Sequence, residues 1–194
     1  MFWVRMISAP ASIYNFMGTS TNYKINIVSS LVVQNRLYCN VVGATSSTSL
    51  TVGNFYHIAA TGIVSGANTT TKIYVNGVLE GTATVSAASP AAGTMTIGNS
   101  TGEADSLGVN ADMGDVRIYN RVLTDGEIRS IYHARGSDGM NGGLVLRLPL
   151  KEAAPSAVPV GVGFVKDVSP NKNNYSPTGS PVYSHSVFRY RRKV

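Results

Sequence analysis

The sequence predicts an all-β sandwich with one short helix near residues 125–135. Short apolar segments with the period of strands follow one another at intervals of about 8–12 residues, a spacing typical of such sandwiches. Asn76-Gly77 stands between two of these segments and predicts a tight hairpin. Thr124 and Glu127 have the spacing of a capping box, and apolar residues at helical intervals follow them. Because a helix of about three turns is unstable alone, we expect it to lie against the strands.

Six strands are expected in the first third of the chain. Each is a short run of apolar, β-branched or aromatic residues between clusters of Ser, Thr, Asn, Gly or Pro. They are expected at residues 2–7, 13–17, 23–27, 36–41, 45–51 and 55–60. The Ser/Thr-rich run at 45–51 favours a sheet edge, whereas the run at 55–60 is apolar on both faces and favours the centre of a sheet.

The strongest local signal is the hairpin around Asn76-Gly77. Lys72–Val75 and Val78–Glu80 flank this pair, whose residues readily adopt the two positive φ angles of a type I′ turn. A further strand is expected at 94–98, and the polar residues 99–110 predict a loop.

A strand and the helix follow this loop. Val116–Tyr119 alternates apolar and polar side chains, which predicts a strand with one buried face. The Thr124 hydroxyl is expected to accept the amide hydrogen of Glu127, whose carboxylate reaches back to Thr124. Gly136 is expected to end the helix in a left-handed conformation. The apolar face of the helix consists of Ile128, Ile131 and Tyr132.

One more paired strand is expected after the helix. Residues 136–143 predict a short turn, so the apolar run Leu144–Leu150 is expected close to the helix and to the strand before it. Beyond this run the sequence predicts a surface loop at 151–163, turns at 167–180 and a last strand at 182–190.

The composition indicates one self-sufficient core. A chain of 194 residues is long enough to fold without a metal or a disulfide. The single cysteine, Cys39, has apolar neighbours that predict a buried thiol. The first residues lack the pattern of a signal peptide, and no run approaches the roughly 18 apolar residues of a membrane span.

The net charge of +6 is concentrated near the end of the chain. Residues 189–194 form a basic tail that predicts either contact with an acidic partner surface or a solubilising end. Four cations are too few to indicate sequence-specific recognition of nucleic acid. The candidate contact residues of the tail are Arg189, Arg191, Arg192 and Lys193.

Five ordered segments resemble the successive signatures of laminin-G-like, concanavalin A-like β-sandwich domains. These segments are Phe55–Ala59, Ile73–Gly77, Ile97-Gly98, Gly114–Leu123 and Glu127-Ile128. The resemblance implies an antiparallel two-sheet jelly roll with the short helix beside it, formed by a single domain over residues 1–188. It does not by itself imply a function, because this fold carries lectins, adhesion modules, glycan-cleaving enzymes and structural units.

The order of the segments departs from the family pattern. Residues 144–183, which begin with an apolar strand and continue into a loop rich in Asp, Ser and Asn, resemble the segment that normally comes first. Phe2–Arg5 resembles an inner strand that normally follows that segment. The chain is therefore expected to be circularly permuted, or else to complete a neighbouring copy by exchange of its last segment.

Catalytic chemistry is not indicated. Glycan-cleaving members of this fold carry paired carboxylates on one strand. The nearest pairs here, Glu103/Asp105 and Asp112/Asp115, lie in or beside the predicted loop, so we expect a protein that is not an enzyme. The three histidines lack the spacing of metal ligands and are His57, His133 and His185. Of these, His57 is expected to be a satisfied histidine of the core or of an interface.

The resemblance implies a candidate calcium site. Relatives use oxygen ligands from the Asp-Ser-Asn loop and from an acid before the DVRIY strand. The matching residues are Asp167, Asn171 and Asn173, with Asp115 or Asp112. Lys172 brings positive charge toward the same place, and Pro170 and Tyr175 stand where glycines are usual. Asp115 could equally pair with Arg117 or Arg147, so an ordinary structural loop remains the alternative.

Carbohydrate binding would use exposed aromatic rings beside polar side chains. Tyrosines on the wet face of strands are also routine, so the pattern is weak. The candidate residues are Tyr14, Tyr23, Tyr74 and Tyr119.

Two functions follow from these expectations. The first is a non-enzymatic structural or adhesive module at a phage virion surface, such as a capsid decoration or fibre protein, which binds other virion subunits as a homo-oligomer or binds surface glycans. The low charged fraction of 13% suits surfaces engaged with partners. The alternative is a carbohydrate-binding, calcium-dependent, lectin-like module of a bacterial surface protein, located at the cell surface or outside the cell.

Overall fold

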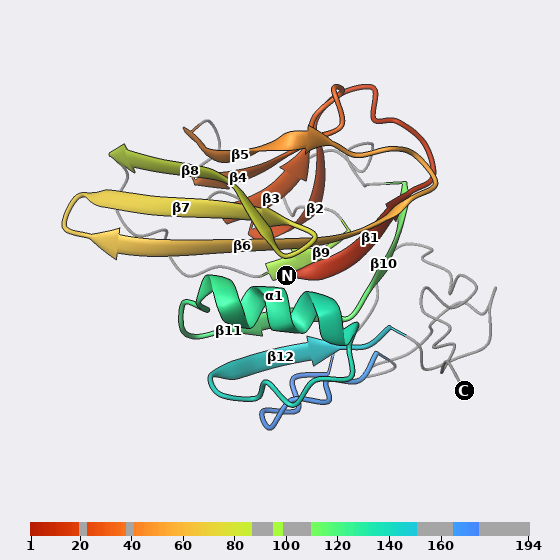
Figure 1. Cartoon of the computed structure of the whole chain (residues 1–194), viewed down its shortest axis with the longest axis vertical. Helices are drawn as coiled ribbons and strands as arrows, with labels where there is room; N and C mark the ends of the chain where they lie inside the picture. The colour runs from red at the N-terminus through yellow and green to blue at the C-terminus, as the bar shows by residue number, and fades with distance from the viewer. Residues whose placement is uncertain (20–22, 38–40, 87–94, 99–109, 151–164, 175–194) are drawn as a thin grey trace.

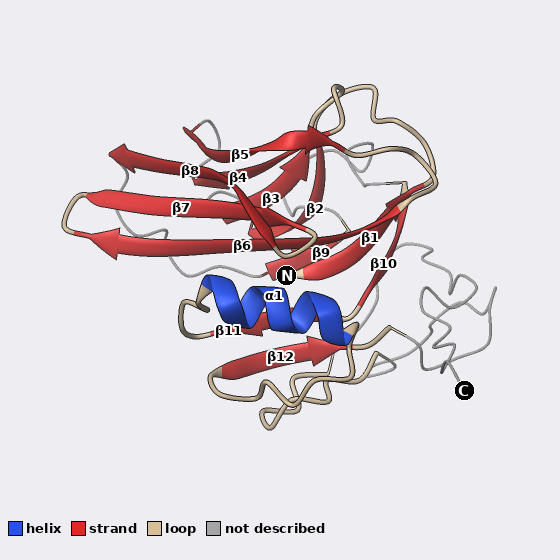
Figure 2. Cartoon of the chain, viewed as in Figure 1, coloured by secondary structure: helices blue, strands red, loops and turns tan. Residues whose placement is uncertain are grey.

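The structure is a computed structural model that describes residues 1–19, 23–37, 41–86, 95–98, 110–150 and 165–174. These residues form two five-stranded antiparallel sheets packed face to face, a two-stranded sheet beside them and one helix (Figure 1). Strands dominate the fold (Figure 2), so the prediction of an all-β jelly-roll sandwich with one short helix is confirmed.

The sheets are named after their central strands. The β6 sheet has the order β10 (Ala111–Gly114), β1 (Phe2–Met6), β6 (Phe55–Ser65), β7 (Asn68–Val75) and β8 (Val78–Ser86). The β3 sheet has the order β5 (Val41–Ser49), β4 (Val32–Leu37), β3 (Tyr23–Ile27), β2 (Tyr14–Thr19) and β9 (Met95–Ile97). The two-stranded sheet pairs β11 (Val116–Tyr119) with β12 (Leu144–Leu148). The helix α1 spans Asp125–Ala134.

The hydrophobic core lies between the two five-stranded sheets. Alternate residues of β1 point inward, and Phe2 meets Phe16 of β2 with ring centroids 5.2 Å apart. Ile58 and Ile73 of the β6 sheet are fully buried, as is Ile27 of the β3 sheet. Side chains that alternate along each strand therefore supply one face to this core, as the period of two requires.

The hairpin predicted at Asn76-Gly77 is confirmed. The two residues have φ angles of 52° and 77°, and they join β7 to β8. Both strands are longer than predicted, because the pairing continues through threonine-rich sequence as far as Asn68 and Ser86.

Two further differences from the sequence-based expectation concern the strand at 36–41 and β10. The strand expected at 36–41 is wrong, because β4 ends at Leu37 and β5 begins at Val41. Asn35 points into the core and donates to the carbonyl oxygens of Thr61 (3.2 Å) and Lys72 (3.4 Å), so a polar residue interrupts the apolar period that would mark β4. The second difference is β10, which pairs with β1 where a loop boundary was expected. Cys39, the loop at 151–163 and the strand at 182–190 lie outside the described residues.

The helix begins as predicted. The Thr124 hydroxyl accepts the Glu127 amide hydrogen at 3.2 Å, and the Glu127 carboxylate accepts the Thr124 amide hydrogen at 2.8 Å. The left-handed conformation starts one residue earlier than expected, at Arg135, and continues at Gly136. No helix in the described part of the chain is long and apolar enough to cross a membrane.

The helix covers the outer face of the β6 sheet. Ile128 and Ile131 pack on Ala59 and Tyr74, which point away from the main core. Figure 1 shows α1 between the β6 sheet and β12 in this view. The β6 sheet is thus covered on both faces over part of its area.

His57 is enclosed beneath α1. It is 1% exposed, its ring centroid lies 5.1 Å from that of Trp3, and its Nδ1 has no hydrogen-bond partner. It is therefore a core histidine as expected, but one ring nitrogen is unsatisfied. Burial lowers the pKa of His57 to about 3, and the neighbouring positive charges act in the same direction.

The pH dependence of stability tests this placement. The unfolded chain protonates His57 near pH 6.5, whereas the folded chain does not do so until about pH 3, so stability should fall as the pH drops through this window. The His57 contribution has a slope of at most about 1.4 kcal/mol per pH unit. Urea unfolding of the wild type and of His57→Gln between pH 7 and 5 should show a steeper fall in the wild type. Equal slopes would contradict the burial of a neutral His57.

A glycine substitution tests the contact between the hairpin and the helix. A Cβ at Gly77 would lie 3.1 Å from the Tyr132 Cβ and 3.2 Å from the Arg129 Cα, at a positive φ. Gly77→Ala should therefore lower the free energy of unfolding by about 1–2 kcal/mol. The matched control is Gly62→Ala in β6, where a Cβ meets no atom within 4 Å and stability should not fall. Similar urea midpoints for the two variants would contradict the tight docking of α1.

Candidate functional site

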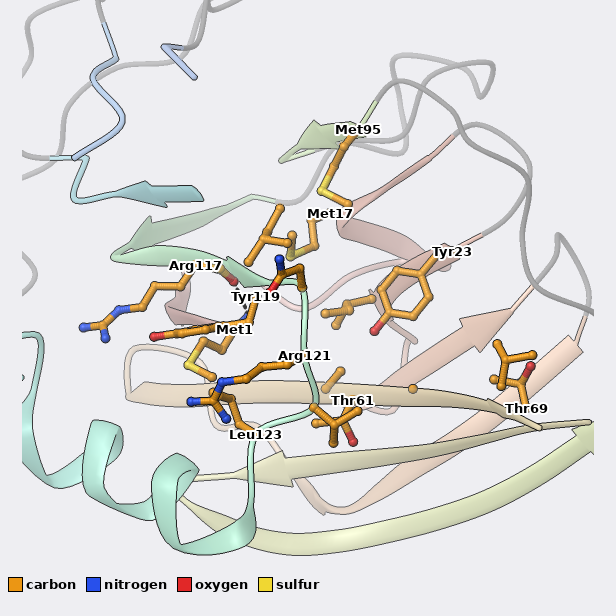
Figure 3. Close-up of a pocket in the computed structure, with 17 residues that line it drawn as sticks. Met1, Met17, Tyr23, Thr61, Thr69, Met95, Arg117, Tyr119, Arg121 and Leu123 are labelled. Carbon is orange, nitrogen blue, oxygen red and sulfur yellow. Dashed lines mark hydrogen bonds between the residues drawn. The ribbon is translucent and has the colours of Figure 1, made fainter. Parts of the chain in front are cut away.

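A cleft of about 430 Å³ opens between the two sheets at one end of the sandwich (Figure 3). The β3 sheet contributes Met17, Tyr23, Ile25 and Met95, and the β6 sheet contributes residues 60–62, 64 and 69. The third wall consists of Met1 and residues 117–123, which lead from β11 toward α1. We call this hollow the interior cleft.

Polar contacts hold the third wall in place. The Asn120 amide donates to the Gly143 carbonyl oxygen at 2.9 Å, and Arg121 Nε donates to that of Gly142 at 2.8 Å. The Arg121 guanidinium also donates two hydrogen bonds, of 2.6 and 2.9 Å, to the carboxylate of Glu127. These bonds, with those from Thr124, lower the pKa of Glu127 to about 2. The segment is thus tied to the first turn of α1 and to the turn before β12.

A buried arginine anchors the strand from which this wall leads. Arg117 is 1% exposed and donates two hydrogen bonds to Asp138, of 2.7 and 2.8 Å, and further bonds to Asp115. Arg147 of β12 also donates to Asp115, at 2.9 Å. Burial would raise the pKa of Asp138, but the bonds from Arg117 outweigh it and lower that pKa. Asp115 therefore pairs with both arginines that the sequence offered as its partners.

The predicted calcium ligands do not converge. Both oxygens of Asp167 are already engaged, by the Arg147 amide (2.9 Å), the Ser169 amide and hydroxyl (each 2.8 Å) and the Asn173 amide (2.7 Å). Asn171 and Asn173 turn their side-chain amide groups toward the Val145 carbonyl oxygen.

The two acids expected to complete the calcium set have arginine partners. Asp112 pairs with Arg5, and Asp115 lies between Arg117 and Arg147. The described residues contain no group of three His, Cys, Asp or Glu side chains that could hold a metal ion. The donor set does not fit calcium, and the 165–174 loop is explained by its own hydrogen bonds.

The four candidate tyrosines separate into three places. Tyr23 and Tyr119 both line the interior cleft. Tyr74 is 1% exposed and donates to Asp125 at 2.7 Å, below a second hollow of about 360 Å³ on the outer face of the β6 sheet, which we call the outer groove. Tyr14 is half-buried against the main core and lines neither hollow.

The remaining candidate residues do not join this site. His133 is exposed on α1 and is not among the lining residues of either hollow. Glu103, Asp105, His185 and the basic tail at 189–194 lie outside the described residues. Sequence reasoning missed Met17, Met95 and Arg121, because the methionines have the pattern of ordinary core residues and Arg121 that of a loop residue.

Calcium addition tests the engagement of Asp167. If its oxygens are saturated by protein donors, millimolar calcium should leave the thermal midpoint unchanged to within about 1 °C, because a ligand that does not bind the folded state cannot stabilise it. Magnesium at the same ionic strength is the control. A midpoint raised by calcium alone would contradict this description of the loop.

Solved structures with the same fold are found in several organisms. A Bacteroides ovatus protein of proposed carbohydrate-binding function matches with a TM-score of 0.69 at 18% identity, covering 94% of this chain and 52% of its own length. A Trypanosoma rangeli sialidase gives a TM-score of 0.54 at 16% identity, with 69% and 22% covered. A heptameric SAP-like pentraxin of Limulus polyphemus gives 0.52 at 13% identity, with 68% and 67% covered.

These likenesses establish the fold alone. The chain spans about half the length of the Bacteroides ovatus protein and less than a quarter of the sialidase. No curated protein matches the chain.

The family is established by the sequence match. Residues 1–129 match the model of the concanavalin A-like lectin/glucanases superfamily, a laminin-G-like family, and this match covers most of the chain. It includes β1 to β11 and the first half of α1, while β12 lies beyond it. The chain belongs to the concanavalin A-like lectin/glucanases superfamily.

Proposed function

We propose that this protein is a non-enzymatic carbohydrate-binding module and that the interior cleft is its glycan site. The observation that carries the proposal is one cleft of ligand size whose lining includes Tyr23 and Tyr119, two tyrosines from opposite halves of the sequence. The carbohydrate-binding role proposed for the Bacteroides ovatus protein supports the same class of function.

The chemistry of the cleft suits a sugar. Burial raises the pKa of the Tyr23 hydroxyl well above its usual range, and a side-chain hydrogen bond with Asn35 acts in the opposite direction. A tyrosine hydroxyl is protonated at neutral pH and can donate to a sugar oxygen. Tyr119 is among the lining residues of the cleft; its hydroxyl donates to the Met140 carbonyl oxygen at 2.9 Å, and its ring packs against the hydrophobic cluster beneath α1. Asn120 adds hydrogen-bonding groups to the cleft, whereas the Thr61 hydroxyl bonds to Tyr74 on the outer face of the β6 sheet. Aromatic surface with a few polar groups is the combination that sugar rings require.

The same walls support the non-enzymatic part of the proposal. Hydrolysis of a glycosidic bond ordinarily uses two carboxyl groups on either side of that bond. No Asp or Glu is present among the described residues that line the interior cleft. Asp112 and Asp115, the nearest candidates from the sequence, form ion pairs with arginines.

Filling the cleft tests the proposal. Gly62 lies in the wall formed by β6, and a Cβ there meets no atom within 4 Å, so Gly62→Phe should place a ring in the cleft without disturbing the sandwich. A glycan array followed by calorimetric titration should show binding with a dissociation constant in about the millimolar range for wild type and at least a tenfold loss for Gly62→Phe.

The control variant is Thr82→Phe, on an exposed position of β8 that lines neither hollow. It should bind as wild type does. Undiminished binding by Gly62→Phe would place the glycan elsewhere, and the absence of binding to any glycan would overturn the proposed function.

We propose, as a second candidate, a subunit role at a virion surface. It is favoured by β8, the edge strand of the β6 sheet, which exposes Val78 (57%) and Leu79 (39%). An unpaired edge with apolar side chains can add a second copy. Light scattering should then give a defined oligomer that Val78→Ser reduces to a monomer, whereas a monomeric wild type would oppose this role. A location at a virion or cell surface stays a prediction.

A further inference from the structure

We propose that the interior cleft selects a neutral sugar that bears a methyl group, such as a 6-deoxyhexose or an N-acetylhexosamine, and that the methyl group enters the part of the cleft lined by methionines. This inference rests on the proposed function, because it names the class of sugar that the same cleft would take.

The wall formed by the β3 sheet is apolar. Met17 and Ile25 are each 2% exposed, and Met95 lies on β9, the strand paired with β2. Figure 3 shows the side chains of Met17 and Met95 in the part of the hollow on the β9 side. Methionine side chains are flexible and polarisable, so they adapt closely to a small apolar group. A hydroxymethyl group in the same place would leave its hydroxyl without a hydrogen-bond partner, which is costly.

The polar groups are confined to other parts of the cleft. The Tyr23 hydroxyl points into the hollow in Figure 3, whereas the Thr61 hydroxyl points to the other side of β6, where it bonds to Tyr74. Asn120 belongs to the third wall. A ligand must therefore present hydroxyl groups on one side and an apolar group on another. A methyl-bearing sugar has both, whereas a simple hexose has hydroxyl groups on nearly every carbon.

The charge balance favours a neutral ligand. Arg121 borders the cleft, but Glu127 compensates its guanidinium through two hydrogen bonds. Arg117 also lines the cleft, but its side chain points away from the hollow in Figure 3. Its guanidinium is bound to Asp138 and Asp115. Both arginines that line the cleft thus have carboxylate partners, and neither guanidinium is free to attract an acidic sugar.

Matched sugar pairs test this selection by calorimetric titration. D-fucose differs from D-galactose, and D-quinovose from D-glucose, by the loss of one hydroxyl group that leaves a methyl group. N-acetyl-D-glucosamine compared with D-glucose tests the acetyl methyl. In at least one pair we expect the methyl-bearing sugar to bind about fourfold more tightly, the effect of burying one methyl-sized group.

Two variants locate the effect. Met95 is half-buried, so Met95→Gln should fold, keep measurable binding and lose the preference for the methyl-bearing sugar. Met95→Leu, which keeps the wall apolar, should retain the preference. Loss of the preference in both variants or in neither would contradict the role of this wall.

The outcomes separate the two proposals. If the parent hexoses and their methyl-bearing partners bind equally, and Gly62→Phe abolishes both, the glycan site stands and the methyl selection is wrong. If N-acetylneuraminic acid binds more tightly than its neutral precursor N-acetyl-D-mannosamine, the selection for neutral sugars is wrong. If no sugar binds, the proposed function fails, and this inference fails with it.

Discussion

The buried guanidinium of Arg117 holds together the segments that form the third wall of the interior cleft. A charge that is 1% exposed is tolerated only with close partners, and Arg117 finds them in Asp115 and Asp138. Asp115 is held at a φ of 47°, where the chain leaves β10 in the β6 sheet and enters β11 in the two-stranded sheet. Asp138 follows α1, and Arg147 of β12 completes the network. Removing one partner would leave a buried charge at a cost of about 3–5 kcal/mol, so these segments are held together.

The interior cleft results from how closely the sheets approach one another. On the side of β5 and β8 they are almost in backbone contact: a Cβ at Gly81 would lie 2.2 Å from the Thr45 carbonyl oxygen, and one at Gly43 would lie 2.5 Å from the Thr71 hydroxyl. At the cleft the β3 sheet presents large side chains such as Met17 and Met95, the β6 sheet presents small residues such as Gly62, and the chain after β11 closes the gap from the side. The two sheets are therefore closely packed on the side of β5 and β8 and separated at the interior cleft. The ion-pair network of Arg117 fixes the third wall of this cleft.

Local patterns predicted the elements that local interactions form. The hairpin at Asn76-Gly77 and the capping box of Thr124 and Glu127 depend on neighbouring residues alone, and both are confirmed. β10 was missed because Ala111–Gly114 lacks β-branched residues and becomes a strand only by pairing with β1. The site was harder to predict. Tyr23 and Tyr74 look alike in the sequence, yet one borders the cleft and the other is buried, which depends on long-range packing.

Nuclear magnetic resonance of the methionine methyl groups tests the central claim directly, because the six methionines report on the whole sandwich. Titration with N-acetyl-D-glucosamine should shift only the signals of residues that line the interior cleft, which are Met1, Met17 and Met95. The signals that should stay in place are those of Met6, Met113 and Met140. Binding that shifts none of the signals of Met1, Met17 and Met95 would contradict the interior cleft as the glycan site. The outer groove, which no methionine lines, would then be the alternative site.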